Sequence, residues 1–175
     1  AGRDAIAYAL DHCEARMALV HDSVTDMFER ARPTNMTRLT SISSDVTVLH
    51  DVGPSDHALL MYTSGTTGRP KGVVHTQASL LAGGWTPAIA HDLSDQDRAF
   101  CVLPICHING LCVTVMGALV SGGSVAIAEK FSTSRFWDQI ETTKSTWFSV
   151  VPTIISHLLH NDANPNDRTK SRLRF

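Results

Sequence analysis

The sequence has little excess charge of either sign and no long hydrophobic run, and each of these absences excludes a class of protein. Lysine and arginine number 15 against 17 aspartates and glutamates, so the formal net charge is -2 with histidine neutral. This balance provides no broad basic field for a nucleic acid backbone. No apolar stretch approaches the roughly 18 residues of a membrane-spanning helix, and no apolar targeting segment follows Ala1. We therefore expect a cytoplasmic protein with neither a nucleic acid partner nor a membrane span.

Cysteine is also scarce, with four residues at positions 13, 101, 106 and 112. A disulfide framework is not expected, because 175 residues that are 43% hydrophobic can build a core without covalent staples. Together with His107, the last three cysteines raise the question of a metal site. Their spacing, with four and five intervening residues inside apolar stretches, differs from the close cysteine pairs of structural zinc sites. We interpret them as small buried hydrophobic residues.

The apolar pattern alternates between helix-like and strand-like segments, which is typical of an α/β layer fold. Helices are expected at 5–15, 24–31, 77–90, 111–120, around 136–140 and 152–159, with Thr76 and Ser132 as caps. Strands are expected at 17–20, 46–49, 58–62, 73–75, 99–103, 125–127 and 147–151. Residues 33–47 and 161–167 are interpreted as loops. Residues 173–175 read as the opening of another strand, so the chain is expected to be a piece of a larger domain.

The most informative segment is residues 62–73, Tyr-Thr-Ser-Gly-Thr-Thr-Gly-Arg-Pro-Lys-Gly-Val. Its three glycines allow the backbone to turn tightly and to direct N–H groups at an anion. Four hydroxyl side chains add donors for phosphate oxygens, Lys71 supplies a positive charge, and Arg69 offers a second. Pro70 stiffens the loop and so limits the entropy lost when a ligand binds. The segment is therefore interpreted as a phosphate-binding loop.

This loop is not the Walker loop of P-loop nucleotide hydrolases, which has four residues between its glycines and a Ser or Thr after its lysine. Here two residues separate Gly65 from Gly68, and Gly72 follows Lys71. Composition alone also fits an ordinary exposed turn, because small polar residues dominate turns. The ordered succession of hydroxyls, glycines, proline and lysine favours phosphate binding over that alternative.

At every position, residues 62–72 resemble the signature of the adenylate-forming enzymes, which include acyl-CoA synthetases, luciferases and the adenylation domains of peptide synthetases. Residues 103–110 are similar to the next motif of that family, Leu-Pro-apolar-aromatic-His-x-x-Gly. The resemblance extends from about 59 to 159 and includes 122–125, Phe131, 136–137 and 151–154. The run around Trp147 is most similar to bacterial acyl-CoA synthetases and to relatives of oxalate–CoA ligase.

The resemblance implies that residues 1–175 are part of an N-terminal AMP-binding domain with an α/β fold, and that the C-terminal part of the enzyme is absent. It implies an AMP-forming acid–thiol ligase that activates a carboxylic acid with ATP and Mg²⁺ and then transfers the acyl group to coenzyme A. The phosphates would be held by Thr63, Ser64, Gly65, Thr66, Thr67, Gly68 and Lys71, and Thr63 would also contact the magnesium ion.

The resemblance also implies that His107 borders the passage of the acyl group and the thiol, although from position alone a histidine in such a loop is more often a structural hydrogen-bonding residue. Cys106 stands where relatives usually carry Phe or Tyr, so the acid (fatty, aromatic or short dicarboxylic) is left open.

The family's Tyr-Gly-x-Thr-Glu segment, its ribose-binding aspartate and its C-terminal lysine do not occur in this sequence. The chain alone is therefore expected to be inactive. Two alternatives for the whole protein remain: a non-catalytic nucleotide-binding relative and the adenylation domain of a peptide synthetase.

Overall fold

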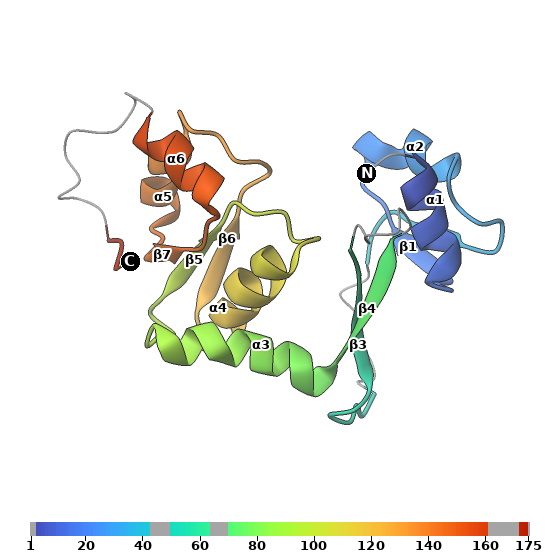
Figure 1. Ribbon diagram of the computed structural model, residues 1–175, viewed down its shortest axis with the longest axis horizontal. Coiled ribbons are helices and arrows are strands. Elements are labelled where there is room, and N and C mark those ends of the chain that lie inside the picture. The colour runs from blue at the N-terminus through green and yellow to red at the C-terminus, as the bar shows by residue number, and fades with distance from the viewer. Residues whose placement is uncertain (1–2, 43–49, 64–69, 161–171, 175) are drawn as a thin grey trace. The chain divides into compact units, whose positions relative to one another are not determined.

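Helices alternate with short strands in the computed structural model, which describes residues 3–42, 50–63, 70–160 and 172–174. This mixture confirms the α/β class expected from the sequence. The chain divides into two units, Ala1–His75 and Thr76–Phe175. Figure 1 shows the elements of each unit.

The first unit contains two small sheets. Strands β1 (Met17–Leu19) and β2 (Thr37–Leu39) pair in parallel, with Met17 opposite Thr37. Strands β3 (His57–Thr63) and β4 (Lys71–Thr76) form the other sheet. The helices are α1 (Arg3–His12), the 3₁₀ turn η1 (Asp22–Val24) and α2 (Thr25–Glu29). Val20, Phe28 and Met36 form the small core of this unit.

Several expectations for the first unit need correction. The first helix ends at His12 rather than continuing to 15, and the expected loop 33–47 contains strand β2. The first strand is not buried as expected, because Met17 and Leu19 are 63% and 57% exposed. The strand expected at 46–49 lies outside the described residues.

The second unit is built on a parallel three-stranded sheet with the order β6-β5-β7. Its strands are β5 (Arg98–Cys101), β6 (Ser124–Ile127) and β7 (Trp147–Phe148). Its helices are α3 (Gln77–Ala90), η2 (Asn109–Met116), α4 (Gly117–Val120), α5 (Phe136–Thr143) and α6 (Pro152–Leu159). Figure 1 shows α3 and α4 on one side of this sheet and α5 and α6 on the other.

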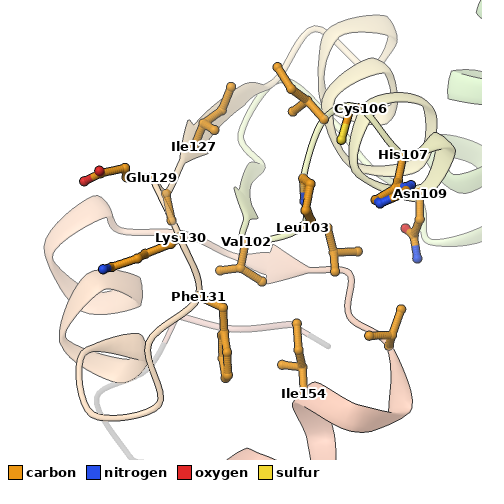
Figure 2. A pocket seen from close by; sticks show the side chains of 14 residues that line it. Val102, Leu103, Cys106, His107, Asn109, Ile127, Glu129, Lys130, Phe131 and Ile154 are labelled. Carbon is orange, nitrogen blue, oxygen red and sulfur yellow. The ribbon is translucent and has the colours of Figure 1, made fainter. Parts of the chain in front are cut away.

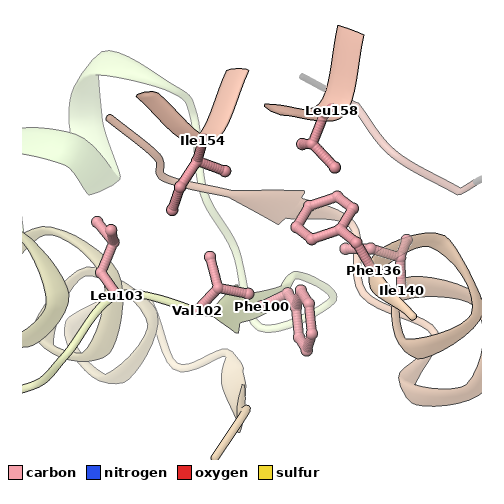
Figure 3. Close-up of a cluster of buried hydrophobic side chains, with 7 residues drawn as sticks. All are labelled: Phe100, Val102, Leu103, Phe136, Ile140, Ile154 and Leu158. Atoms are coloured by element: carbon pink, nitrogen blue, oxygen red, sulfur yellow. The ribbon is translucent and has the colours of Figure 1, made fainter. Parts of the chain in front are cut away.

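Alternation of side chains along β5 accounts for the two faces of the sheet. Phe100 points into a cluster with Phe136 and Ile140 of α5 and with Ile154 and Leu158 of α6, drawn in Figure 3. The ring of Phe136 lies 5.6 Å from that of Phe100 and 5.0 Å from that of Phe148, both edge to face. The neighbouring residue Ala99 packs instead against Ala118 of α4. The sheet is thus the middle layer of an α/β/α sandwich.

Two helix starts differ in how well the sequence predicted them. Thr76 caps α3 as expected, because its Oγ1 accepts a hydrogen bond of 3.2 Å from the backbone N–H of Ser79. Ser132 does not cap α5. The helix begins after Arg135 without a side-chain cap, and the Ser132 hydroxyl lies 3.3 Å from the Ser134 hydroxyl instead.

The apolar segment expected as one α-helix at 111–120 is a π-helix, η2, that continues into α4. Its packing against α3 is close, since a Cβ on Gly84 would lie 2.8 Å from the carbonyl oxygen of Met116. The chain then turns through Gly122, whose φ of +77° suits glycine, into β6. Strand β7 covers only 147–148 of the expected 147–151.

Candidate functional site

The flanks of the predicted phosphate loop lie in the first unit, at the ends of two paired strands. Strand β3 ends at Thr63 and β4 begins at Lys71. The Thr63 hydroxyl donates a hydrogen bond of 3.4 Å to the carbonyl oxygen of Lys71, which joins the two ends of the loop. Of the other predicted phosphate-binding residues, Ser64, Gly65, Thr66, Thr67 and Gly68 lie outside the described residues.

Lys71 is exposed, and its amino group forms no ion pair with any residue that the structure describes. The next residue is a glycine for a steric reason. A Cβ on Gly72 would lie 2.9 Å from Leu60 Cδ1 and 3.6 Å from Tyr62 Cε1 on the paired strand. The Lys-Gly pair therefore combines an available charge with a close approach of β4 to β3.

Tyr62 anchors the strand that leads into the loop. Its hydroxyl donates to the carbonyl oxygen of Ala9 at 3.3 Å and lies 2.8 Å from His12 Nδ1, both on α1. The His12 ring packs edge to face on Tyr62, with centroids 5.8 Å apart. Burial raises the pKa of the Tyr62 phenol, with smaller contributions from Cys13 and Tyr8, so it stays protonated and able to donate. No local sequence signal marks this contact, because it spans 50 residues.

A cavity of about 850 Å³ lies in the second unit, where β5 and β6 end. It is lined by residues 102–107, 109, 127–131, 151 and 154. Figure 2 shows Cys106, His107 and Asn109 toward one end and Glu129 and Lys130 toward the other, with Val102, Phe131 and Ile154 between them.

The sheet topology explains why a cavity forms there. From β5 the chain crosses to β6 on one side and then to β7 on the other, so β5 lies at the switch point of a parallel sheet. In open α/β sheets, ligands bind outside the carboxyl ends of the strands at such a point. The motif Leu103–Gly110 directly follows β5 and therefore lies at this crevice.

A tight turn presents His107 to the cavity. Its backbone N–H donates to the carbonyl oxygen of Pro104 at 3.0 Å, and its carbonyl oxygen accepts from the N–H of Leu111 at 3.1 Å. Gly110 is required by the same turn, because a Cβ there would lie 2.5 Å from the carbonyl oxygen of Pro104. The His107 side chain is exposed and lines the cavity. The structure thus places the predicted histidine on the wall of a cavity.

Asn109 is a polar residue of the cavity wall that the sequence did not single out. Its Oδ1 accepts a hydrogen bond of 2.9 Å from the Ser149 hydroxyl, in the segment between β7 and α6. The partners are 40 residues apart, so no local pattern indicates the pair.

The cysteines differ in their surroundings. Cys101 and Cys112 are 0% and 5% exposed, and burial raises the pKa of both thiols. Cys106 is exposed on the cavity wall. Among the described residues no group of three or more His, Cys, Asp or Glu side chains is placed to hold a metal ion. Within the same described part, no helix has the length and apolar character needed to cross a membrane.

The sequence matches a family model over its whole length, residues 1–175, and that family is described as AMP-binding enzyme. It is 48% identical over 122 residues to sulfoacetate–CoA ligase of Cupriavidus necator, covering 70% of this chain and 23% of the ligase. It is 36% identical over 124 residues to oxalate–CoA ligase of Arabidopsis thaliana, covering 70% and 24%. The chain thus spans about a quarter of the length of these curated relatives.

Solved structures of o-succinylbenzoate CoA synthetase from Bacillus subtilis have the same fold. A double mutant bound to a product analogue matches with a TM-score of 0.76 and 25% identity, over 90% of this chain and 33% of that one. The complex with ATP and magnesium ion matches with a TM-score of 0.76 and 24% identity, over 91% and 34%.

Proposed function

The chain belongs to the AMP-binding enzyme family. On that premise we propose that it is the phosphate-binding segment of an ATP-dependent acyl-CoA synthetase. In the proposed reaction a carboxylate oxygen attacks the α-phosphorus of ATP, the bond to the β-phosphate oxygen breaks, and pyrophosphate leaves. The thiol of coenzyme A then attacks the acyl carbonyl, loses its proton, and AMP leaves. The observation that carries the proposal is the complete signature at 62–72 between the paired strands β3 and β4.

In this proposal Thr63, Ser64, Gly65, Thr66, Thr67, Gly68 and Lys71 hold the β- and γ-phosphates. The exposed amino group of Lys71 fits this role, since no described residue neutralises it. The Thr63 hydroxyl donates to the Lys71 carbonyl and keeps lone pairs that can accept a cation, which suits a Mg²⁺ contact. Magnesium, when bound, supplies charge neutralisation on the phosphates. The protein's own contribution is positioning and electrostatic stabilisation.

His107 is proposed to border the passage through which the acid and the thiol of coenzyme A meet. Support comes from its place on a cavity at the switch point of the sheet. Polar side chains lie at both ends of the cavity, and such groups suit the reacting carboxylate and the recognition of a substrate substituent.

The acid is proposed to be short and to carry a second polar or charged group. Sulfoacetate and oxalate, named for two relatives, are both acids of this kind. Cys106, which stands where an aromatic residue is usual in the family, lines the same cavity.

The proposal is tested with the full-length protein that carries this chain. AMP and acyl-CoA are measured by chromatography after incubation with ATP, Mg²⁺, coenzyme A and either sulfoacetate, oxalate, butyrate or palmitate. Formation of AMP together with a CoA thioester of one acid supports the synthetase. AMP formation without a thioester would favour a peptide-synthetase adenylation domain, and ATP binding without either product would favour a non-catalytic relative.

A further inference from the structure

We propose that Asn109 determines acid specificity by offering its amide N–H groups to a polar substituent of the substrate, and that Ser149 is the positioning residue that fixes Asn109. This inference rests on the proposed function, which supplies the reaction and the class of acid. It adds the group that would select a polar acid over an apolar one of the same size.

The first support is the placement of Asn109. It begins η2, two residues after His107, and lines the same cavity. Figure 2 shows the two side chains on the same side of the cavity, away from Glu129 and Lys130. A substituent near the reacting carboxylate would therefore meet Asn109 rather than the charged pair at the other end.

The second support is the hydrogen bond that orients the amide. The Ser149 hydroxyl donates to Oδ1 of Asn109 at 2.9 Å, and both side chains are half-buried. With Oδ1 engaged by Ser149, the amide presents its Nδ2 group, which carries two donors. A hydroxyl in this position can fix the amide only while the segment after β7 stays packed beside η2, so the hydrogen bond ties the cavity residue Asn109 to the segment between β7 and α6.

The third support is that the two N–H donors of Asn109 Nδ2 have no hydrogen-bond acceptor among the described residues. The backbone carbonyl of Asn109 is already occupied, because it accepts from the Thr114 hydroxyl at 3.3 Å. An apolar acyl group pressed against Nδ2 would remove its water without replacing the hydrogen bonds, whereas a sulfonate, carboxylate or hydroxyl oxygen would satisfy them.

The test measures kcat/KM for acid-dependent ATP–pyrophosphate exchange in the full-length protein, with sulfoacetate and oxalate as polar acids and propionate and butyrate as apolar acids. Asn109→Leu keeps the approximate volume and removes all donors. Asn109→Asp keeps the acceptor for Ser149 and replaces Nδ2 with a second oxygen. Ser149→Ala removes only the fixing bond. Ser134→Ala is the matched control, because it removes an exposed hydroxyl that does not line the cavity.

We expect Asn109→Leu and Asn109→Asp to lower the polar-to-apolar ratio of kcat/KM by about 10- to 100-fold, because a site built on hydrogen-bond donors discriminates strongly. Ser149→Ala should lower it by roughly fivefold, the size of one ordinary hydrogen bond. Ser134→Ala should leave it unchanged. A merely structural Asn109 would reduce all four acids alike and leave the ratio constant.

The outcomes separate the two proposals. Exchange with polar acids and a constant ratio in both Asn109 variants would overturn the specificity role and leave the synthetase intact. A wild-type preference for propionate or butyrate would overturn it as well. Absence of exchange with every acid would overturn the synthetase and this inference together. If Asn109→Leu fails to fold, as judged by its melting curve, the polar-to-apolar ratios of kcat/KM in Asn109→Asp and Ser149→Ala still test the specificity role.

Discussion

The guanidinium Nη1 of Arg174 lies 2.6 Å from Oδ2 of Asp97, a carboxylate 77 residues earlier that is only 3% exposed. The same carboxylate accepts hydrogen bonds from the Thr146 hydroxyl at 2.8 Å and from the Ser94 backbone N–H at 2.9 Å. The backbone N–H of Arg174 also donates to the carbonyl oxygen of Thr146 at 2.7 Å. One buried carboxylate thus joins the start of β5, the start of β7 and Arg174. The opening of a further strand was expected at 173–175, but the described residues 172–174 form no strand.

Asp97 should make stability depend on pH in the acid range. Burial by itself raises the pKa of Asp97, but hydrogen bonds from Arg174, Ser94 and Thr146 outweigh burial and hold the pKa below its ordinary value of 3.8. A lowered folded-state pKa contributes stability that is present above the unfolded value and is lost as pH falls below it. Urea unfolding should therefore show stability declining as pH drops below about 4.

Asp97→Asn tests this assignment. The free energy of unfolding of this variant should be about 1–3 kcal/mol lower at pH 7, because the charge-assisted hydrogen bonds are weakened while the side-chain shape is kept. The decline of the unfolding free energy below about pH 4 should also become shallower. Asp95→Asn, an exposed carboxylate nearby, is the control. If the unfolding free energy falls equally steeply below about pH 4 in wild type and in Asp97→Asn, Asp97 is not the residue responsible for the pH dependence.

Gly110→Ala should disrupt the turn that presents His107. The new Cβ would lie 2.5 Å from the carbonyl oxygen of Pro104 and 3.0 Å from that of Leu103, and backbone atoms cannot move aside cheaply. Overpacking of this kind typically costs about 1–3 kcal/mol. Gly53→Ala is the matched control, since its Cβ would have only Asp56 Oδ2 nearby, at 3.7 Å. Gly110→Ala should melt at a lower temperature than Gly53→Ala. Equal melting temperatures would contradict the close approach of Gly110 to the Pro104 carbonyl.

Alkylation should distinguish the cysteines. Cys106 is exposed, whereas Cys101 and Cys112 are buried and burial raises the pKa of their thiols, so they stay protonated near pH 8. Iodoacetamide should label Cys106 more than about tenfold faster than either buried residue, because the thiolate is the reactive form. Peptide mass spectrometry over time measures the rates, and a urea-unfolded sample is the control. Equal rates in the folded protein would show that the β5–η2 region is packed differently.

Tyr62→Phe should loosen the strand that leads into the proposed phosphate loop. The change removes the hydroxyl bonded to the Ala9 carbonyl and to His12 Nδ1. We expect a loss of about 0.5–1.5 kcal/mol in unfolding free energy and weaker ATP binding by calorimetry. Tyr8→Phe keeps the ring that stacks on His12 and should change neither quantity. Identical ATP affinities in Tyr62→Phe and wild type would argue against a connection between α1 and the loop.

The sequence predicted the elements whose signals are local. Thr76 followed by an apolar helical pattern indicated α3, and Pro152 indicated the start of α6. Strand β2 was missed, because its Thr-rich segment has weak periodicity and is stabilised by parallel pairing with β1 across the intervening helices. The π-helical form of η2 was missed for a related reason, since the apolar pattern does not reveal how closely α3 approaches it at Gly84.

For the candidate site, the sequence predicted the motif residues but not the contacts that hold them in place. The motifs indicated Thr63, Lys71 and His107, and the structure places the first two at the ends of paired strands and the third on a cavity. The supporting contacts were not predictable. His12 with Tyr62 and Ser149 with Asn109 join residues 50 and 40 positions apart, and only the folded topology brings them together.

The proposed role of Lys71 and its loop in binding ATP for adenylation is tested by ATP–pyrophosphate exchange in the full-length protein, with a panel of acids from oxalate to palmitate. Lys71→Ala is compared with Arg135→Ala, which removes an exposed cation far along the chain from the loop. We expect acid-dependent exchange in wild type and in Arg135→Ala, and exchange reduced by at least about tenfold in Lys71→Ala, because a charged phosphate contact is lost. Exchange that is unchanged in Lys71→Ala, or absent from a folded wild type that still binds ATP, would contradict the proposed role of the loop.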